Sequence, residues 1–344
     1  MAGRVELATR HRGHAPNRER EYSVRRILVT GAAGFIGSHL AERLLRRGDA
    51  VIGFDNFNDY YDPARKRANE RRLCAYPNFR MVEADLRDRD ALMRLFAAEK
   101  IDAVAHLGAM AGVRDAMRLP DLYVNVDLNG TQNVLDAARA VGGVGNFVMA
   151  STSSVYGNTT QIPFVETDPC DRPLQPYAAA KRAAEILGYT YHYLFGQNFT
   201  VLRFFTVYGP NGRPDMMAYL LADSVSKGRE IPLYDGGQMY RDWTFVDDTV
   251  SGIVAALDRP LGYEIINLGR GEPVLLKDFV AIMEELSGHK ANVVSTPRLA
   301  ADFVRNEADI SKARRLLAYD PQVSVAEGVR RFWEWYREHD SAKN

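Results

Sequence analysis

Cysteine is scarce in this sequence, with two in 344 residues, Cys74 and Cys170. The two lie far apart and outside any CxxC or histidine-rich spacing, so we expect neither a disulfide framework nor a metal site. Two reduced thiols are typical of a cytoplasmic protein, and we predict that location. Apolar runs are short as well. None approaches the ~20 residues that span a membrane, so no membrane partner is expected.

A net charge is also lacking, because 44 basic residues are balanced by 44 acidic ones. A neutral chain gives no electrostatic support for nucleic acid as a partner, and we expect none. Residues 1–24 are rich in Arg and His but lack the apolar core of a signal peptide. We predict that they form a disordered arm. A small-molecule site is therefore the kind of site that the composition favours.

Strand-like and helix-like segments alternate from residue 25 onward. The apolar run 25–30 predicts a buried strand, and the segment 35–47, which stops at Gly48, predicts an amphipathic helix. Further strands are predicted at 50–55, 79–85, 103–109, 146–152 and 199–205. This alternation predicts an α/β fold with a Rossmann-type, doubly wound parallel sheet.

The length of 344 residues predicts about two domains, at roughly 150 residues each. The last third is less regular and predicts a smaller α+β domain. Residues 245–257 still have the pattern of a strand and helix of the first domain, so we expect the second domain to be discontinuous. We assign 25–205 plus 241–262 to the Rossmann domain and 206–240 plus 263–340 to the smaller domain.

A glycine-rich turn follows the first predicted strand. Residues 30–37 read TGAAGFIG, which places Gly31, Gly34 and Gly37 in a GxxGxxG motif between a strand and a helix. Glycines let the backbone approach a pyrophosphate closely, and the free N–H groups at the helix N-terminus can bind its charge. We predict a dinucleotide cradle that also includes Phe35 and Ile36.

Acidic residues follow the next two strands. Asp55 closes the second strand, where a carboxylate can accept both ribose hydroxyls of the dinucleotide and repels a 2′-phosphate. This position favours NAD over NADP. Asp85 and Leu86, after the third strand, are predicted to contact the adenine.

Tyr177 is followed one helical turn later by Lys181. On one face of a helix, the ammonium favours the phenolate form of the tyrosine, which can then exchange protons with a carbinol. A hydroxyl cluster at 151–154 ends another predicted strand, where Thr152 can hold a sugar hydroxyl beside the same tyrosine. Turn and N-cap hydrogen bonding is the alternative for some of these hydroxyls.

These pieces together resemble the extended short-chain dehydrogenase/reductase family from Arg26 to about Tyr336. The resemblance rests on four segments, TGAAGFIGSHL, STSSVYG, YAAAK and RDWTFVDD. Three more segments, NFNDYYDPARKRAN, AGVR and RFFTVYGPNGRPDMM, are similar to the branch of that family that epimerises UDP-glucuronate at C4. The family implies a tightly held NAD, a nucleotide-sugar substrate in the cleft between the two domains, and a homodimer.

The resemblance also implies roles for single residues. Tyr177 becomes the acid/base, Lys181 its partner and a ribose ligand, and Thr152 the hydroxyl that binds O4 of the sugar. Arg213 becomes the partner of the substrate carboxylate, because a planar guanidinium suits a carboxylate. The other implied substrate-binding residues are Arg114, Ser153, Ser154, Thr206, Arg241 and Asp302.

The implied reaction is interconversion of UDP-glucuronate and UDP-galacturonate through a 4-keto sugar, and other reactions stay open. A 4-epimerase of UDP-glucose and UDP-galactose needs the same Tyr, Lys and Thr but no carboxylate partner. Dehydratases and decarboxylases of the family carry acidic groups where this chain has Ser153 and Ser154, so they are less favoured. A non-catalytic NAD-binding protein would be expected to lose Tyr177 or Lys181.

The chain departs from the family pattern at four positions. Asp127 stands where the family usually has Asn, three residues before a glycine, and an ionised Asp only accepts hydrogen bonds. Gly108, Met110 and Asn211 replace the usual Ala, Gln and Trp. We expect the hydrogen-bond network around Asp127 to differ, and the last three changes weaken the assignment of the sugar.

Overall fold

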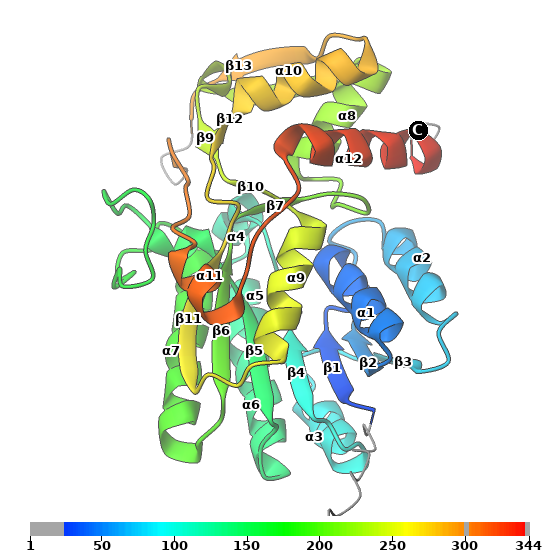
Figure 1. The fold of residues 1–344 in the computed structure, drawn as a ribbon, viewed down its shortest axis with the longest axis vertical. Helices are drawn as coiled ribbons and strands as arrows, with labels where there is room; N and C mark the ends of the chain where they lie inside the picture. Colours follow the sequence, from blue (N-terminus) through cyan, green and yellow to red (C-terminus); the bar gives the residue numbers. More distant parts are fainter. Residues whose placement is uncertain (1–23, 299–302, 341–344) are drawn as a thin grey trace, which may run out of the picture.

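A seven-stranded parallel sheet forms the centre of the computed structural model, which describes residues 24–298 and 303–340 (Figure 1). Apart from Val24, the predicted arm lies outside the described residues. Across the sheet the strands are β11 (Tyr263–Leu268), β6 (Phe199–Phe204), β5 (Asn146–Thr152), β4 (Ala103–His106), β1 (Arg26–Thr30), β2 (Ala50–Asp55) and β3 (Phe79–Glu83). Every neighbouring pair is parallel. The predicted Rossmann-type sheet is confirmed.

Helices cover both faces of the sheet, which explains why every residue of β5 and β6 is buried. One face packs against α1 (Phe35–Arg47), α2 (Pro63–Leu73), α9 (Val246–Leu257) and α11 (Ser311–Leu317). The other packs against α3 (Arg89–Ala98), α6 (Gly130–Ala140) and α7 (Pro176–Phe195). The chain enters α6 through α4 (Val113–Arg118), α5 (Pro120–Tyr123) and the π-helical turn η1 (Val124–Asn129).

The helix predicted at 35–47 has those bounds in the structure. Leu40, Leu44 and Leu45 are buried at helical spacing. Gly48 ends the helix with φ of 98°, and its N–H donates to the carbonyl groups of the last turn. A glycine adopts this left-handed conformation at no steric cost, so the local sequence is sufficient to place the helix end.

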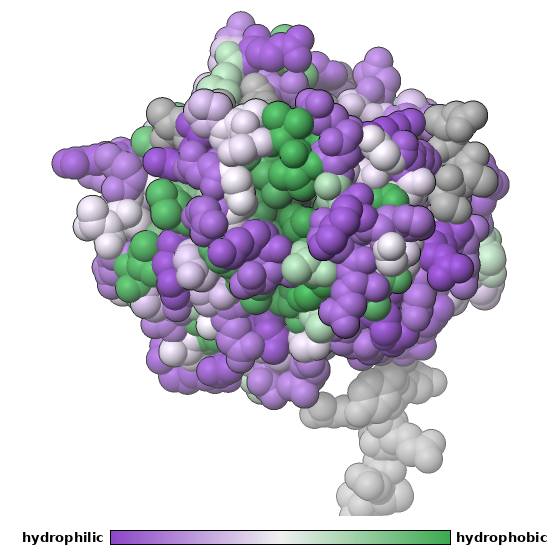
Figure 2. All heavy atoms as spheres, turned by 90° about the horizontal axis from the view of Figure 1, so that it is seen from above, coloured by the Kyte–Doolittle hydropathy of each residue, from purple (hydrophilic) through white to green (hydrophobic). Residues whose placement is uncertain are grey.

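A second lobe lies above the carboxyl ends of the sheet strands (Figure 1). Its strands form two-stranded sheets, namely β7 (Thr206–Tyr208) with β10 (Trp243–Phe245), β8 (Glu230–Tyr234) with β13 (Asn292–Thr296), and β9 (Tyr240–Arg241) with β12 (Val274–Leu275). Its helices are α8 (Met217–Lys227), η3 (Asp235–Gly237), α10 (Leu276–Ser287) and α12 (Val325–His339). Seen from above, the molecule is mostly hydrophilic, with a strip of apolar residues near the middle (Figure 2).

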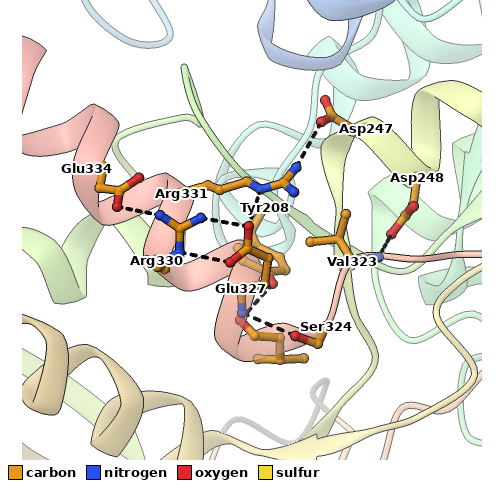
Figure 3. A network of polar contacts seen from close by, with 10 residues as sticks. Tyr208, Asp247, Asp248, Val323, Ser324, Glu327, Arg330, Arg331 and Glu334 are labelled. Atoms are coloured by element: carbon orange, nitrogen blue, oxygen red, sulfur yellow. Dashed lines mark hydrogen bonds and ion pairs between the residues drawn. The ribbon is translucent and has the colours of Figure 1, made fainter.

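Polar contacts tie α12 to the start of α9 (Figure 3). Glu327 accepts hydrogen bonds from Arg330 and Arg331, and Arg331 also lies 3.7 Å from Asp247. Asp248 accepts the N–H of Val323 at 3.0 Å just before α12 begins. These bonds join the second lobe to a helix that covers the sheet.

The assignment of residues 263–340 to the smaller domain is wrong for one strand, β11, and for α11, which covers a face of the central sheet. Residues 263–268 form β11, which pairs with β6 along six residues at the edge of the central sheet. The prediction placed these residues in the smaller domain because their pairing partner lies more than 60 positions earlier, beyond the reach of any local pattern. The helices within the described ranges include none long and apolar enough to cross a bilayer.

Candidate active site

A cavity of about 750 Å³ lies at the carboxyl ends of the sheet strands, between the sheet and the second lobe. Its volume suits a sizeable organic ligand. Most of the predicted site residues line it. They are Gly31, Gly34, Phe35, Ile36, Gly37, Asp55, Asp85, Leu86, Thr152, Ser153, Ser154, Tyr177, Lys181, Thr206, Arg213 and Arg241.

The glycine turn leaves no room for side chains. Gly31 has φ of 70°, and a Cβ atom there would come within 2.9 Å of Gly108. A Cβ atom on Gly37 would lie 2.0 Å from the Gly31 carbonyl oxygen. Gly34 is the N-cap of α1 and supplies no side-chain cap, so the first N–H groups of the helix remain available to an anion. The geometry fits a dinucleotide pyrophosphate.

The two acidic residues at the strand ends differ in their surroundings. Asp55 is buried, and its oxygens accept the N–H groups of Ala33 at 3.1 Å and Phe57 at 2.9 Å. Burial raises the pKa of Asp55. Each carboxylate oxygen has a second lone pair for a ligand hydroxyl. Asp85 instead forms two hydrogen bonds with the Arg87 guanidinium, which hold its pKa well below the usual range.

The candidate acid/base pair lies on α7. Pro176 and the N-cap Gln175 begin the helix, and Tyr177 and Lys181 follow one turn apart. Lys181 is buried and donates to the Ala150 carbonyl at 3.0 Å. Burial lowers the pKa of Lys181.

Tyr177 and Thr152 both line the cavity. Burial raises the pKa of Tyr177, and the charge of Asp127 raises it further, whereas Thr152 and Arg213 lower it. A phenol and a threonine hydroxyl therefore meet at the cavity wall, where they could bind and deprotonate a hydroxyl of a ligand.

The hydroxyl groups of residues 151–154 have two roles: they support the local structure, and they line the cavity. Ser151 is buried and donates to Glu185 at 2.6 Å, so its role is structural. Thr152 accepts the N–H of Ser154 at 3.1 Å and caps the short helix η2 (Ser153–Tyr156). Ser153 accepts a hydrogen bond from Asn306 at 2.9 Å. Asn306 lines the cavity and was not predicted, because nothing in the local sequence connects it to a serine 153 positions earlier.

Arg213 enters the cavity beside two residues that were also not predicted. Its Nε and Nη2 donate to Asp215 at 2.9 and 2.6 Å. Its guanidinium lies 5.3 Å from the ring centroid of Tyr60. Burial alone would lower the pKa of Arg213, but the pairing with Asp215 outweighs it and raises the pKa. Asp215 engages one edge of the guanidinium and leaves Nη1 outside that pairing. The segment 212–215 reads GRPD, and this position of Asp215, two residues after Arg213, was the signal in the sequence that could have predicted it.

Thr206 and Arg241 also line the cavity. Thr206 begins β7, and Arg241 donates to the carbonyl of Phe303 at 2.9 Å. Arg114 lies in α4, two residues after the cavity-lining Gly112, and its side chain is not among those described. Asp302 lies outside the described residues.

A model of the NAD dependent epimerase/dehydratase family matches residues 27–269, well over half of the chain. The chain belongs to this family. The UDP-glucuronate 4-epimerase of Thermodesulfobacterium geofontis (strain OPF15) is 43% identical over 313 residues, which cover 91% of this chain and 96% of that protein. UDP-glucuronate 4-epimerase 4 of Arabidopsis thaliana is 42% identical over 328 residues, which cover 90% of this chain and 75% of that protein.

Solved structures agree with membership of the epimerase/dehydratase family. A crystal structure of UDP-glucuronic acid 4-epimerase from Bacillus cereus in complex with UDP-glucuronic acid and NAD matches with a TM-score of 0.85 and 35% identity. The match covers 91% of this chain and 99% of that chain. The resemblance inferred from the sequence motifs is confirmed.

Proposed function

We propose that this family member interconverts UDP-glucuronate and UDP-galacturonate by NAD-dependent epimerisation at C4. One observation carries the proposal: Arg213 lines the same cavity as Tyr177, Lys181 and Thr152. A base for a sugar hydroxyl and a cation for a sugar carboxylate are thus available in one site. The relatives named UDP-glucuronate 4-epimerase support the same substrate.

The glycine cradle and Asp55 would hold the cofactor. The N–H groups at the start of α1 suit the pyrophosphate, and the Asp55 carboxylate suits the adenosine ribose and disfavours a 2′-phosphate. A bound NAD would supply the hydride acceptor and donor for oxidation and re-reduction of the sugar at C4. The reaction therefore has no net redox change.

Tyr177 moves the proton. Its phenolate takes the proton of the O4 hydroxyl as the C4 ketone forms, and the phenol returns that proton to O4 after the ketone has turned over. Thr152, which lines the same cavity as Tyr177, holds O4 in reach. The buried ammonium of Lys181 favours the phenolate through its charge.

Arg213 holds the carboxylate. A 4-keto-uronic acid is a β-keto acid and loses CO₂ when its carboxylate bond aligns with the ketone. Because Asp215 engages Nε and Nη2, the edge that carries Nη1 is the part of the guanidinium that can receive the substrate. Hydrogen bonds from that edge hold the substrate carboxylate so that its C–C bond does not align with the C4 ketone. Ser153 and Ser154 offer no acidic group for elimination or decarboxylation.

The test is a comparison of three substrates. Purified protein is incubated with UDP-glucuronate, UDP-glucose and UDP-N-acetylglucosamine, and the products are identified by NMR. We expect UDP-galacturonate from the first and much slower or no conversion of the others. Preferred conversion of a neutral sugar would overturn the assignment of the carboxylate.

We also propose that the enzyme is a cytoplasmic homodimer. Cys74 and Cys170 are free thiols, as is usual in the cytoplasm. The outer face of α7 exposes large apolar side chains that a second copy could bury, namely Ile186, Tyr189, Tyr193, Leu194 and Phe195. Light scattering on a size-exclusion column tests the dimer, and Leu194→Glu is expected to yield monomers.

A further inference from the structure

A buried carboxyl lies behind the candidate acid/base pair. Asp127 belongs to the π-helical turn η1 and has no exposed surface. Its Oδ1 accepts the N–H of Met110 at 2.7 Å, whereas its Oδ2 has no hydrogen-bond partner among the described residues. Turns of this kind often occur at functional sites. A buried carboxylate with one bare oxygen is costly unless it is protonated or lies near a cation.

The cation near Asp127 is Lys181. The turn η1 packs against α7, which carries Tyr177 and Lys181. Burial raises the pKa of Asp127 to about 7, and the charge of Lys181 opposes that rise. In turn, the charge of Asp127 raises the pKa values of both Lys181 and Tyr177. The charge of Asp127 therefore acts on both members of the candidate acid/base pair.

Two anions beside one ammonium are unfavourable in a buried site, because like charges repel strongly where the dielectric constant is low. We propose that Asp127 is a positioning residue that competes with the Tyr177 phenolate for the charge of Lys181 and is protonated when Tyr177 acts as a base. This inference rests on the proposed function, in which Tyr177 takes the O4 proton. As the phenol O–H bond breaks, a carboxyl O–H bond forms, so the three groups together stay neutral.

Other titratable groups surround the three. They are Tyr123 from α5, His106 from β4, Glu185 from α7 and Arg213 from the loop after β7. Burial lowers the pKa of His106 to about 3 and raises that of Tyr123 to about 12, so both are neutral near pH 7. Glu185 already accepts two hydrogen bonds from the buried Arg203. Asp127, by contrast, has one backbone N–H on Oδ1 and no hydrogen-bond partner on Oδ2 among the described residues.

The variant Asp127→Asn tests the proposal, because an amide keeps an acceptor for the Met110 N–H and removes the charge. In the wild type the carboxyl and the phenol titrate as a pair, and the first proton to leave that pair comes from Asp127. Without the carboxyl, Tyr177 alone sets the acid limb of the kcat/KM profile, which should move to higher pH by about one unit. Coincident acid limbs in the two proteins would overturn the proposal. If the amide variant does not fold, Asp127→Ser, whose hydroxyl also accepts, replaces it.

Infrared difference spectra of the purified holoenzyme give a second readout that does not need turnover. A protonated-carboxyl band that titrates near pH 7 is expected in the wild type and should be absent from Asp127→Asn. In Lys181→Met the midpoint of the carboxyl band should rise by about one unit or more, because the cation that stabilises the Asp127 carboxylate is gone. Absence of the band from the wild type would also refute the proposal.

Asp248→Asn is the matched control. Asp248 is another buried carboxyl with a pKa raised by burial, and it binds the N–H groups of Gln322 and Val323 away from α7. Its replacement should move neither the acid limb nor the carboxyl band. If no UDP-sugar is epimerised, the proposed function fails, and the infrared titration still decides the role of Asp127.

Discussion

At the scale of single residues, Tyr177 and Arg213 divide the chemistry of the site between proton transfer and carboxylate recognition. Tyr177→Phe keeps the ring and removes the hydroxyl, so turnover should fall by ~10² to 10⁴ while UDP-sugar binding survives. Steady-state kinetics and calorimetric binding measure the two effects. Tyr191→Phe is the control on the same helix, since its hydroxyl bonds to Asp136 and its side chain is not among those that line the cavity. Near-normal turnover of Tyr177→Phe would show that another group moves the proton.

Arg213 separates an acidic from a neutral sugar. Removing the charged partner of a desolvated carboxylate costs about 2–5 kcal/mol, whereas a neutral hydroxymethyl group loses an ordinary hydrogen bond of ~1 kcal/mol. Arg213→Ala should therefore reduce turnover of UDP-glucuronate far more than that of UDP-glucose. It should also release CO₂ and leave a UDP-pentose, because the loosened carboxylate can align with the ketone. Kinetics on both sugars, with product analysis, measure both effects.

The comparison of the two sugars and a companion variant, Asp215→Asn, test the role of Arg213 further. Equal losses on both sugars would mean that Arg213 supports its loop rather than reads the carboxylate. Asp215→Asn is the companion variant, because it weakens the pairing that orients Arg213 and keeps the guanidinium. We expect a smaller loss on UDP-glucuronate from Asp215→Asn than from Arg213→Ala.

Sequence reasoning at this scale found the residues that belong to local motifs. The GxxGxxG turn, the Tyr177 and Lys181 spacing and the 151–154 hydroxyls are all short-range patterns, and they meet at one cavity. Asn306 could not be found in this way, because its partner Ser153 lies on a distant segment. The same limit applied to the buried partners of Asp127, which only the packing of η1 on α7 brings together.

At the scale of elements, a buried ion pair joins α7 to β6. Arg203 and Glu185 are both fully buried and share two hydrogen bonds, at 3.0 and 2.8 Å. Glu185 also accepts from Ser151 of β5, and the Arg203 guanidinium lies 4.8 Å from the centroid of the Tyr156 ring. This network therefore fixes α7 against the two strands that end beside the cavity.

Glu185→Gln should lower the free energy of unfolding by about 3–5 kcal/mol, because it leaves the Arg203 charge uncompensated in the interior. Urea unfolding measures the change. Glu185→Gln combined with Arg203→Met should recover much of the loss, since the buried guanidinium is then gone and Arg182, the other partner of Glu185, is partly exposed. Glu327→Gln, in the exposed network of Figure 3, is the control and should leave the urea midpoint nearly unchanged. A similar loss from both single variants would contradict the distinction between the buried and the exposed pair.

At the scale of the whole molecule, the cavity is walled by the sheet below and by the second lobe above. The glycine cradle lies at its base, and Arg241, Phe303 and Asn306 contribute from the lobe. Because the reaction regenerates its cofactor in place, nothing requires the cofactor to leave between turnovers.

The purified protein should consequently carry NAD without added cofactor. Acid extraction followed by chromatography is expected to yield about one nicotinamide dinucleotide per chain, without a 2′-phosphate. Recovery of NADP would overturn the role given to Asp55. A preparation without either dinucleotide would show that the lobe does not retain the cofactor.

The central sheet could be predicted from the sequence, whereas the second lobe could be predicted only in outline. The reason is physical. The strands of the Rossmann sheet are long, buried on both faces and separated by amphipathic helices, so their patterns are visible locally. Two strands of the lobe, β9 and β12, have two residues each and pair antiparallel across more than 30 positions. No periodicity exists at that length, and the edge strand β11 was misplaced for a similar reason.

The late position of β11 has a consequence for synthesis on the ribosome. The strand β6 ends at Phe204, and its second neighbour, β11, is translated only after the first half of the lobe. Until then, the nascent chain displays a row of unpaired backbone groups along an apolar strand, which is a template for intermolecular association. Chains that terminate prematurely before Tyr263 keep that edge permanently, and so should aggregate, whereas chains that continue past Leu268 cover it.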